Sequence, residues 1–154
     1  MVKIPILPMN SARERALALL SQREHGAFEL AQKLTAKGFE TKDIQAVLDE
    51  CAEQGLQSDK RFAENLARYR VQRGYGPNYI RQELHAKHIA DDYIHQALQP
   101  FEADWLDYAY KAWQKKFKQT LNPTIKDKQA FYRFLAYRGF SSELITQMLG
   151  RFLS

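Results

Sequence analysis

The side chains of this sequence that could bind a charged partner form two groups. The larger group lies between residues 105 and 154, which carry nine basic and three acidic side chains. Residues 1–50 and 51–104 are close to neutral. An excess of lysine and arginine attracts DNA phosphates or an acidic protein face. The alternative is an ordinary solvated helix face. The lysines of this segment are Lys111, Lys115, Lys116, Lys118, Lys126 and Lys128.

The second group surrounds the sequence Gly74-Tyr75-Gly76-Pro77. Its members are Arg68, Arg70, Arg73, Tyr75 and Arg81. The two glycines allow backbone conformations that other residues resist, and the proline restricts the backbone after them, so the turn should have a defined shape. It is either a contact surface for a partner or a plain connection between two helices. Glu83, just beyond it, is expected to pair with Lys87 one helical turn later.

Residue patterns typical of catalysis or metal binding are missing from the sequence. Gly74-Tyr75-Gly76 lacks the lysine and the third glycine of a phosphate-binding loop, and no serine lies in a Gly-x-Ser-x-Gly sequence. The four histidines have no metal-ligand spacing. The single cysteine, Cys51, is expected to be a small core residue on a helix. We therefore expect a protein that is not an enzyme and uses no metal or cofactor.

The sequence repeats itself at an offset of 50 residues. Arg13–Leu48 aligns with Ala63–Leu98 without a gap and with ten identical positions, where average composition would give roughly two. A looser third copy is marked by Arg138-Gly139-Phe140, which corresponds to Lys37-Gly38-Phe39. Repeats of this length typically form arrays with an extended surface.

Helical periodicity dominates each copy, and strand patterns are nearly absent. We predict an all-α fold: a tandem array of three three-helix units, about nine helices in all, elongated or curved. The predicted divisions are an N-terminal extension at 1–10 and three-helix repeats at 11–55, 56–100 and 101–154. Joints are expected near Gln54–Ser58 and Leu98–Phe101, with Pro100 closing the second repeat.

Several residues are expected to begin or end these helices. Ser11, Thr41, Ser141 and either Ser58 or Asp59 have side chains suited to helix N-termini, and Gly38 suits a C-terminus. The first helix of the third repeat should run from about Ala103 to Gln119. Its aromatic stripe, which includes Trp105, Tyr110, Trp113 and Phe117, is expected to be core rather than a base-stacking surface.

Composition and the start of the sequence bear on location. With 45% apolar residues and no low-complexity tract, the chain should fold. No apolar run approaches the length of a membrane span. Residues 1–8 resemble neither a secretory signal nor a transit peptide. A cytoplasmic protein is expected.

Three local patterns, one in each repeat, are distinctive. The most specific is Arg73-Gly74-x-Gly76-Pro77-x-x-Ile80-x-x-Glu83-Leu84. The others are Lys33-Leu34-x-x-Lys37-Gly38 and Leu135-x-x-Arg138-Gly139-Phe140. Together these patterns resemble the RecX family of bacterial recombinase regulators, and the resemblance covers essentially the whole chain.

This resemblance implies tandem three-helix units and a non-enzymatic modulator, mostly an inhibitor, of the RecA recombinase. Such a protein would act in homologous recombination, DNA repair and the SOS response. It would bind the RecA filament on single-stranded DNA and lower its ATPase, strand-exchange and coprotease activities. We expect it to act as a monomer.

The second hypothesis is a direct DNA-binding protein of the helix-turn-helix type. Leu34–Leu48 and Leu84–Leu98 each place a short turn between two predicted helices. The first two repeats carry no net positive charge, however, and a sequence reader concentrates basic side chains on its recognition helix. The predicted third helices instead carry Asp43, Asp49, Glu50, Asp91 and Asp92. Weak, sequence-independent DNA binding through the third repeat is compatible with the first hypothesis.

Overall fold

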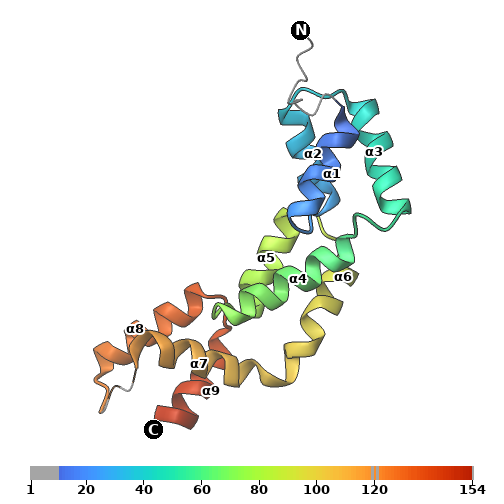
Figure 1. Cartoon of the computed structure of the whole chain (residues 1–154). Helices are drawn as coiled ribbons and strands as arrows, with labels where there is room; N and C mark the ends of the chain where they lie inside the picture. Colours follow the sequence, from blue (N-terminus) through green and yellow to red (C-terminus); the bar gives the residue numbers. More distant parts are fainter. Residues whose placement is uncertain (1–10, 119, 121, 154) are drawn as a thin grey trace. The chain divides into compact units, whose positions relative to one another are not determined.

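The computed structural model describes residues 11–118, 120 and 122–153, and its regular secondary structure within these ranges is entirely helical. Nine α-helices and one 3₁₀ helix follow one another in this part of the chain (Figure 1). They are α1 (Ala12–Gln22), α2 (Ala27–Ala36), α3 (Thr41–Glu53), α4 (Asp59–Gln72), α5 (Pro77–Ala86), α6 (Asp91–Leu98), η1 (Gln99–Asp104), α7 (Trp105–Phe117), α8 (Ile125–Tyr137) and α9 (Ser142–Leu153). The predicted all-α class is confirmed. The predicted N-terminal extension, residues 1–10, lies outside the described residues.

The chain forms two compact units, which divide between Phe62 and Ala63. The first contains α1, α2, α3 and the start of α4, and the second contains everything that follows. Helix α6 leads through η1 directly into α7, so Pro100 lies within a helical segment and does not end one. The joint expected at Leu98–Phe101 is thus not a boundary between compact units. The division into repeats at 11–55, 56–100 and 101–154 stays a prediction.

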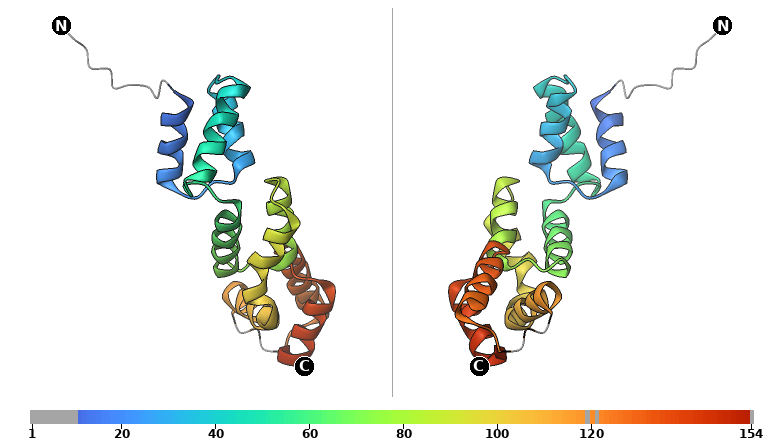
Figure 2. Two further views of the ribbon diagram at one scale, coloured as in Figure 1. Left: turned by 90° about the vertical axis from the view of Figure 1, so that its right-hand side faces the viewer. Right: turned by 90° about the vertical axis from the view of Figure 1, so that its left-hand side faces the viewer.

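In the first unit α1, α2 and α3 lie side by side (Figure 2). Their buried core consists of Ala16, Leu19, Leu30, Leu34, Ile44 and Cys51. The expected place of Cys51 is confirmed, and burial raises the pKa of its thiol.

Most of the expected helix boundaries are confirmed. Ser11 accepts a hydrogen bond from the Glu14 amide at 3.0 Å, while Ser58 and Ser141 accept equivalent bonds at the starts of α4 and α9. Gly38 follows α2 with φ +92°. The prediction for Thr41 is wrong, because α3 begins at Thr41 itself and Glu40 precedes it without a capping side-chain bond.

A buried polar cluster connects the end of α1 to the start of α4 within the first unit. The His25 side chain is 1% exposed, with Nδ1 3.0 Å from the Arg23 carbonyl oxygen and Nε2 2.9 Å from Lys33 Nζ. The carbonyl oxygen can only accept, so Nδ1 carries the proton and Nε2 accepts from the Lys33 ammonium. Asp59 accepts hydrogen bonds from the Ala27 amide at 2.8 Å and the Gln57 side chain at 2.9 Å.

The state of His25 predicts a pH dependence for the first unit. Burial is the main cause that lowers the pKa of His25, and the nearby Arg23 and Lys33 charges lower it further. The hydrogen bond to the Arg23 carbonyl and the Glu29 charge oppose this shift without reversing it. As the pH falls below about 6.5, His25 therefore becomes protonated in the unfolded chain while it stays neutral in the folded chain. The stabilisation from neutral His25 is complete above that pH and is lost as the pH falls towards the folded pKa. We expect the Tm advantage of the wild type over His25→Gln to shrink between pH 7.5 and 5.5, in thermal unfolding followed by circular dichroism. A constant difference would contradict this.

The second unit has an aromatic core centred on α7. Trp105 and Trp113 are 7% and 3% exposed, and Tyr110 stacks on Phe152 of α9 with ring centroids 4.2 Å apart. Phe117 packs against Phe131 of α8 at 4.7 Å. The aromatic stripe is therefore core, as predicted.

The helix expected from Ala103 to Gln119 is divided in the structure. Ala103 belongs to η1, and α7 begins only at Trp105 and ends at Phe117. Gln119 lies outside the described residues. None of the described helices is long and apolar enough to cross a membrane.

Candidate functional site

Two turns, each preceded by an arginine and containing a glycine, meet in the second unit. The Gly76 amide donates a hydrogen bond to the Arg138 carbonyl at 2.7 Å, and the Asn78 amide donates to the Gly139 carbonyl at 3.0 Å. The turn between α8 and α9 thereby accepts a hydrogen bond from the Asn78 amide, which lies in the first turn of α5 and has no partner within that helix. The third repeat is held against the second by main-chain contacts.

Only glycine permits this approach. A Cβ atom on Gly76 would lie 2.7 Å from the Gly139 oxygen, and a Cβ on Gly139 would lie 2.4 Å from the Tyr79 nitrogen. Gly139 also has φ +97°, in the left-handed region. The expected unusual conformation is present at Gly74, with φ +87°. It is not present at Gly76, whose φ is −100°; the need for glycine there comes from the close approach.

The meeting of the two turns creates a groove of about 510 Å³, called here the basic groove. It lies between the end of α4, one side of α7 and the end of α8. Its cations are Arg73, Lys111, Lys115, Lys116 and Arg138. Its apolar lining residues are Val71, Tyr108, Ala112 and Phe134. Among the described residues that line it there is no aspartate or glutamate, so five positive charges converge without an acidic neighbour in the lining.

The two arginines of the basic groove are positioned by aromatic rings. Arg138 donates from Nη1 to the Arg73 carbonyl at 2.8 Å. Its guanidinium lies 4.7 Å from the centre of the Tyr75 ring and 4.8 Å from that of Phe134. The Arg73 guanidinium lies 4.5 Å from the Tyr69 ring. Such contacts orient a guanidinium without neutralising it, so both charges stay available to an anion.

Arg70, a neighbouring candidate, is in a different situation. It donates from Nε and Nη2 to the two carboxylate oxygens of Glu83, at 2.7 and 2.9 Å. These hydrogen bonds raise the pKa of Arg70. Glu83 therefore pairs with Arg70 of α4. The expected contact between Glu83 and Lys87 did not anticipate this pair and stays a prediction. Because its charge is compensated, Arg70 is a positioning residue for the turn.

The alignment of the first two repeats explains why, among the described residues, the arginine at one position is free of an ion pair in the second repeat but not in the first. Arg23 occupies the position of Arg73 in the first repeat, but it pairs with Glu29 through two hydrogen bonds of 3.1 and 2.7 Å. The residue that corresponds to Glu29 is Tyr79. No salt bridge of Arg73 is found within the described part of the chain. The substitution of tyrosine for glutamate leaves the second copy of this arginine uncompensated.

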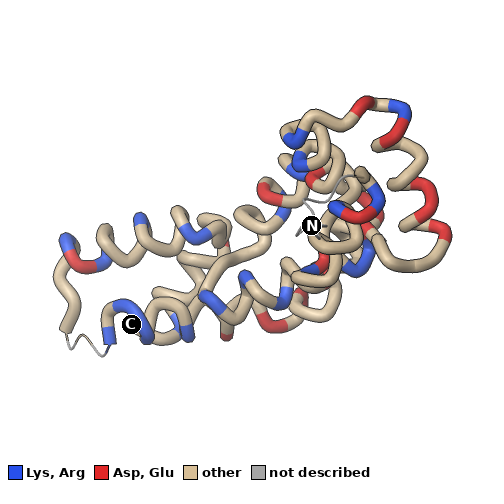
Figure 3. Tube along the Cα trace, turned by 45° about the horizontal axis from the view of Figure 1, so that its top comes forward, with Lys and Arg blue, Asp and Glu red and all other residues tan. Residues whose placement is uncertain are grey.

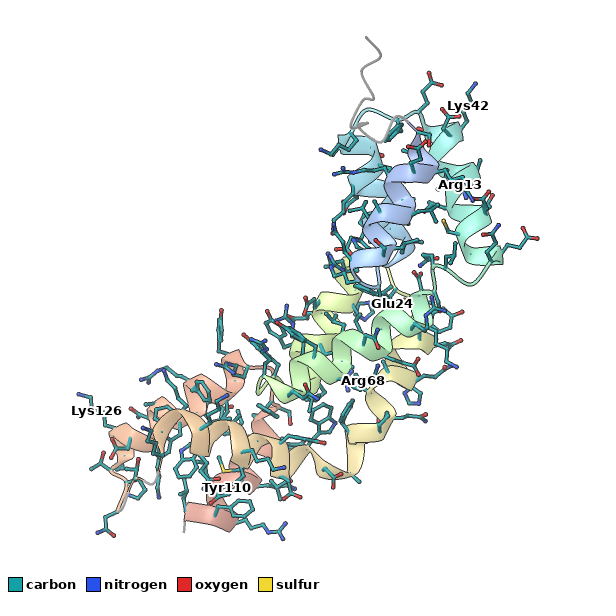
Figure 4. The ribbon with its side chains drawn as sticks, viewed as in Figure 1. Arg13, Glu24, Lys42, Arg68, Tyr110 and Lys126 are labelled. Carbon is teal, nitrogen blue, oxygen red and sulfur yellow. The ribbon has the colours of Figure 1, made fainter. Side chains whose placement is uncertain are left out.

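The remaining candidate residues do not line the basic groove. Arg68 bonds to Asn65 of the same helix, and Arg81 donates to Asn78 at 2.7 Å. Lys118, Lys126 and Lys128 are exposed, and Lys126 projects away from the ribbon (Figure 4). Figure 3 marks the basic and acidic positions among the residues that the structure describes.

The candidates predicted from sequence thus separate into two sets. Arg73, Lys111, Lys115 and Lys116 come together in the basic groove, and Tyr75 lies against Arg138. Arg138 itself was missed as a site residue. A signal existed, because it aligns with Lys37 and Lys87 and so continues a row of basic residues at this point of each repeat.

Models of a known protein family match most of the chain. The model of the first three-helix domain of RecX matches residues 12–51, that of the second matches 58–98, and that of the third matches 102–149. The chain belongs to the RecX family. Regulatory protein RecX of Legionella pneumophila (strain Corby) is 46% identical over 140 residues, which cover 91% of this chain and 93% of that protein. Regulatory protein RecX of Vibrio parahaemolyticus is 41% identical over 142 residues and 92% of each chain.

Solved structures of RecX proteins share the fold. The crystal structure of RecX from Lactobacillus salivarius has a TM-score of 0.77 at 20% identity, with 90% of this chain and 92% of that chain covered. A crystal structure of a regulatory protein RecX has the same TM-score at 26% identity, covering 91% of this chain and 70% of the other. Within the described residues, no group of three or more His, Cys, Asp and Glu side chains could hold a metal ion.

Proposed function

We propose that this chain regulates the RecA recombinase by binding its filament on single-stranded DNA. Binding would lower the ATPase, recombination and coprotease activities of the filament. Membership of the RecX family, whose relatives are named regulatory proteins, supports a regulatory role. The observation that supports the contact itself is the basic groove, which is lined by five cations and, among the described residues, by no aspartate or glutamate. The protein would act as a cytoplasmic monomer.

A nucleoprotein filament suits this distribution of charge. It presents phosphates and protein surface at regular intervals, and a chain with repeated helical units can make several weak contacts at once. Two separate contacts on one chain raise the overall affinity without requiring either to be strong. A positive groove on one unit would supply the electrostatic part of such binding.

Direct reading of duplex DNA by α3 or α6 is disfavoured by charge. Helix α6 begins with the exposed residues Asp91 and Asp92, and α3 carries exposed Asp43 and Asp49. A helix in the major groove lies between phosphate backbones that would repel these carboxylates. We therefore do not propose a helix-turn-helix reader.

Titration of preformed RecA filaments on single-stranded DNA tests the proposal. We expect ATP hydrolysis to fall at protein concentrations well below those that occupy the same bare DNA, measured in parallel by fluorescence anisotropy. Inhibition that begins only where bare DNA is saturated would indicate competition for DNA. An unchanged ATPase rate, together with tight binding of a particular duplex, would overturn the proposal.

A further inference from the structure

The basic groove has a property that charge alone does not explain: its base is apolar. Val71 and Ala112 are buried, and Tyr108 and Phe134 are half-buried. Lysines on an open surface are sufficient to contact a phosphate, which stays largely hydrated. An apolar base beneath a cationic edge suits a ligand that has both a flat, poorly hydrated part and an anionic part. The volume of about 510 Å³ falls in the range of small-molecule sites, roughly 300–1,000 Å³.

The two aromatic rings of the groove, those of Tyr108 and Phe134, are held in place by ring contacts with the core. Tyr108 packs edge-on against Trp105 with centroids 5.8 Å apart, and Phe134 packs edge-on against Phe117 at 5.4 Å. Each ring is therefore anchored in the core of the second unit and lines the groove with a fixed orientation. Anchored rings lose little conformational freedom when a planar group binds against them.

The cations are arranged for more than one phosphate. Lys111 and Lys115 lie one turn apart on α7 and Lys116 follows directly, so three ammonium groups extend along one side of the groove. Arg73 and Arg138 lie at the turn on the other side and carry planar guanidiniums, which can bind phosphate oxygens in pairs. Like charges at this density repel one another, and a bound polyanion offsets that repulsion.

We propose that the basic groove binds a nucleotide whose base is unpaired. The base would lie against Tyr108 and Phe134, and the phosphates would bind the lysines of α7 together with Arg73 and Arg138. The shared chemistry fits a free nucleoside triphosphate or a nucleotide within a single strand. A duplex does not fit, because its bases are stacked and paired. This inference goes beyond the proposed function, since the site would bind its ligand whether or not a recombinase is present.

A base-dependent binding measurement tests the proposal on the full chain. Fluorescein-labelled (dT)₈, an abasic strand of equal length and an eight-base-pair duplex are titrated by anisotropy, and ATP is added as competitor without Mg²⁺. We expect the abasic strand to bind about tenfold more weakly than (dT)₈, because base stacking on aromatic side chains contributes substantially to affinity. The duplex should also bind more weakly than (dT)₈. Displacement of (dT)₈ by ATP would identify free nucleotides as ligands, and base-dependent strand binding without displacement would identify the single strand.

A matched pair of double variants assigns the binding to the groove. Lys115→Gln/Lys116→Gln should weaken (dT)₈ binding about tenfold or more, because it removes two phosphate contacts. Lys37→Gln/Lys42→Gln removes the same charge from exposed positions of the first unit and should leave binding within about twofold, since distant charges are screened.

Two results would overturn the proposal. Equal binding of the abasic strand and (dT)₈, with no displacement by ATP, would mean that the groove holds phosphate only. Equal losses in the two double variants would mean that net charge alone determines binding. Either result leaves the recombinase titration unaffected, so the two proposals fail separately.

Discussion

Replacing Gly139 by alanine should lower the stability of the second unit by about 3–5 kcal/mol, among the larger effects of a single substitution. Two causes add. An alanine at φ +97° costs about 1–2 kcal/mol for the left-handed conformation. Its Cβ would also lie 2.4 Å from the Tyr79 nitrogen and 2.5 Å from the Tyr79 Cβ, so the turn must withdraw from α5 and lose the bonds donated by Gly76 and Asn78. Urea unfolding followed by circular dichroism measures the change.

Two other glycines provide controls for Gly139→Ala. Gly38 has a similar φ of +92°, but a Cβ there would meet nothing within 4 Å. Gly38→Ala should therefore cost only the conformational part, about 1–2 kcal/mol. Gly150 lies within α9, where a Cβ also meets nothing within 4 Å, and Gly150→Ala should be neutral or stabilising by up to about 1 kcal/mol. If Gly139→Ala cost no more than Gly38→Ala, the close approach would not be what holds the turn against α5.

These glycines show what the sequence could and could not predict about the fold. The ends of α2 and α8 were predictable, because a glycine after a helical apolar pattern is a local signal. The need for glycine at position 76 was not predictable, since it depends on a segment more than 60 positions away in the sequence. The Arg70–Glu83 pair is similar: the two residues are thirteen positions apart, and local rules of helix pairing reach only three or four.

The candidate site was predictable in composition but not in geometry. Charge counts identified the lysines of α7 and the arginines near Gly74, but as two separate groups. They form one groove because the turn after α8 reaches the start of α5, bringing Arg138 to the carbonyl of a residue 65 positions earlier. The exclusion of Arg23 also required the structure, because only the ion pair with Glu29 shows that its charge is compensated.

Neutralising the three groove lysines should remove most of the inhibition that we propose for the RecA filament. In Lys111→Gln/Lys115→Gln/Lys116→Gln the arginines and the apolar base remain, so the groove keeps its shape while it loses three of its five cations. We expect the concentration for half-maximal inhibition of filament ATPase to rise by about 10- to 100-fold at low salt. The dependence of log affinity on log salt should become shallower by about 2, because each contact to single-stranded phosphate contributes about 0.7.

The decisive comparison is with lysines of the same basic segment that lie outside the groove. Lys118→Gln/Lys126→Gln/Lys128→Gln removes the same charge from exposed positions, so any long-range attraction weakens equally in the two triple variants. If the groove is the contact, this variant should lose no more than a few-fold in inhibition and keep a steeper salt dependence than the groove variant. Equal losses would mean that the filament senses the overall charge of the segment. Because the control variant keeps more phosphate contacts, and each contact weakens with salt, the difference between the two variants should be largest at low salt and narrow as salt is raised.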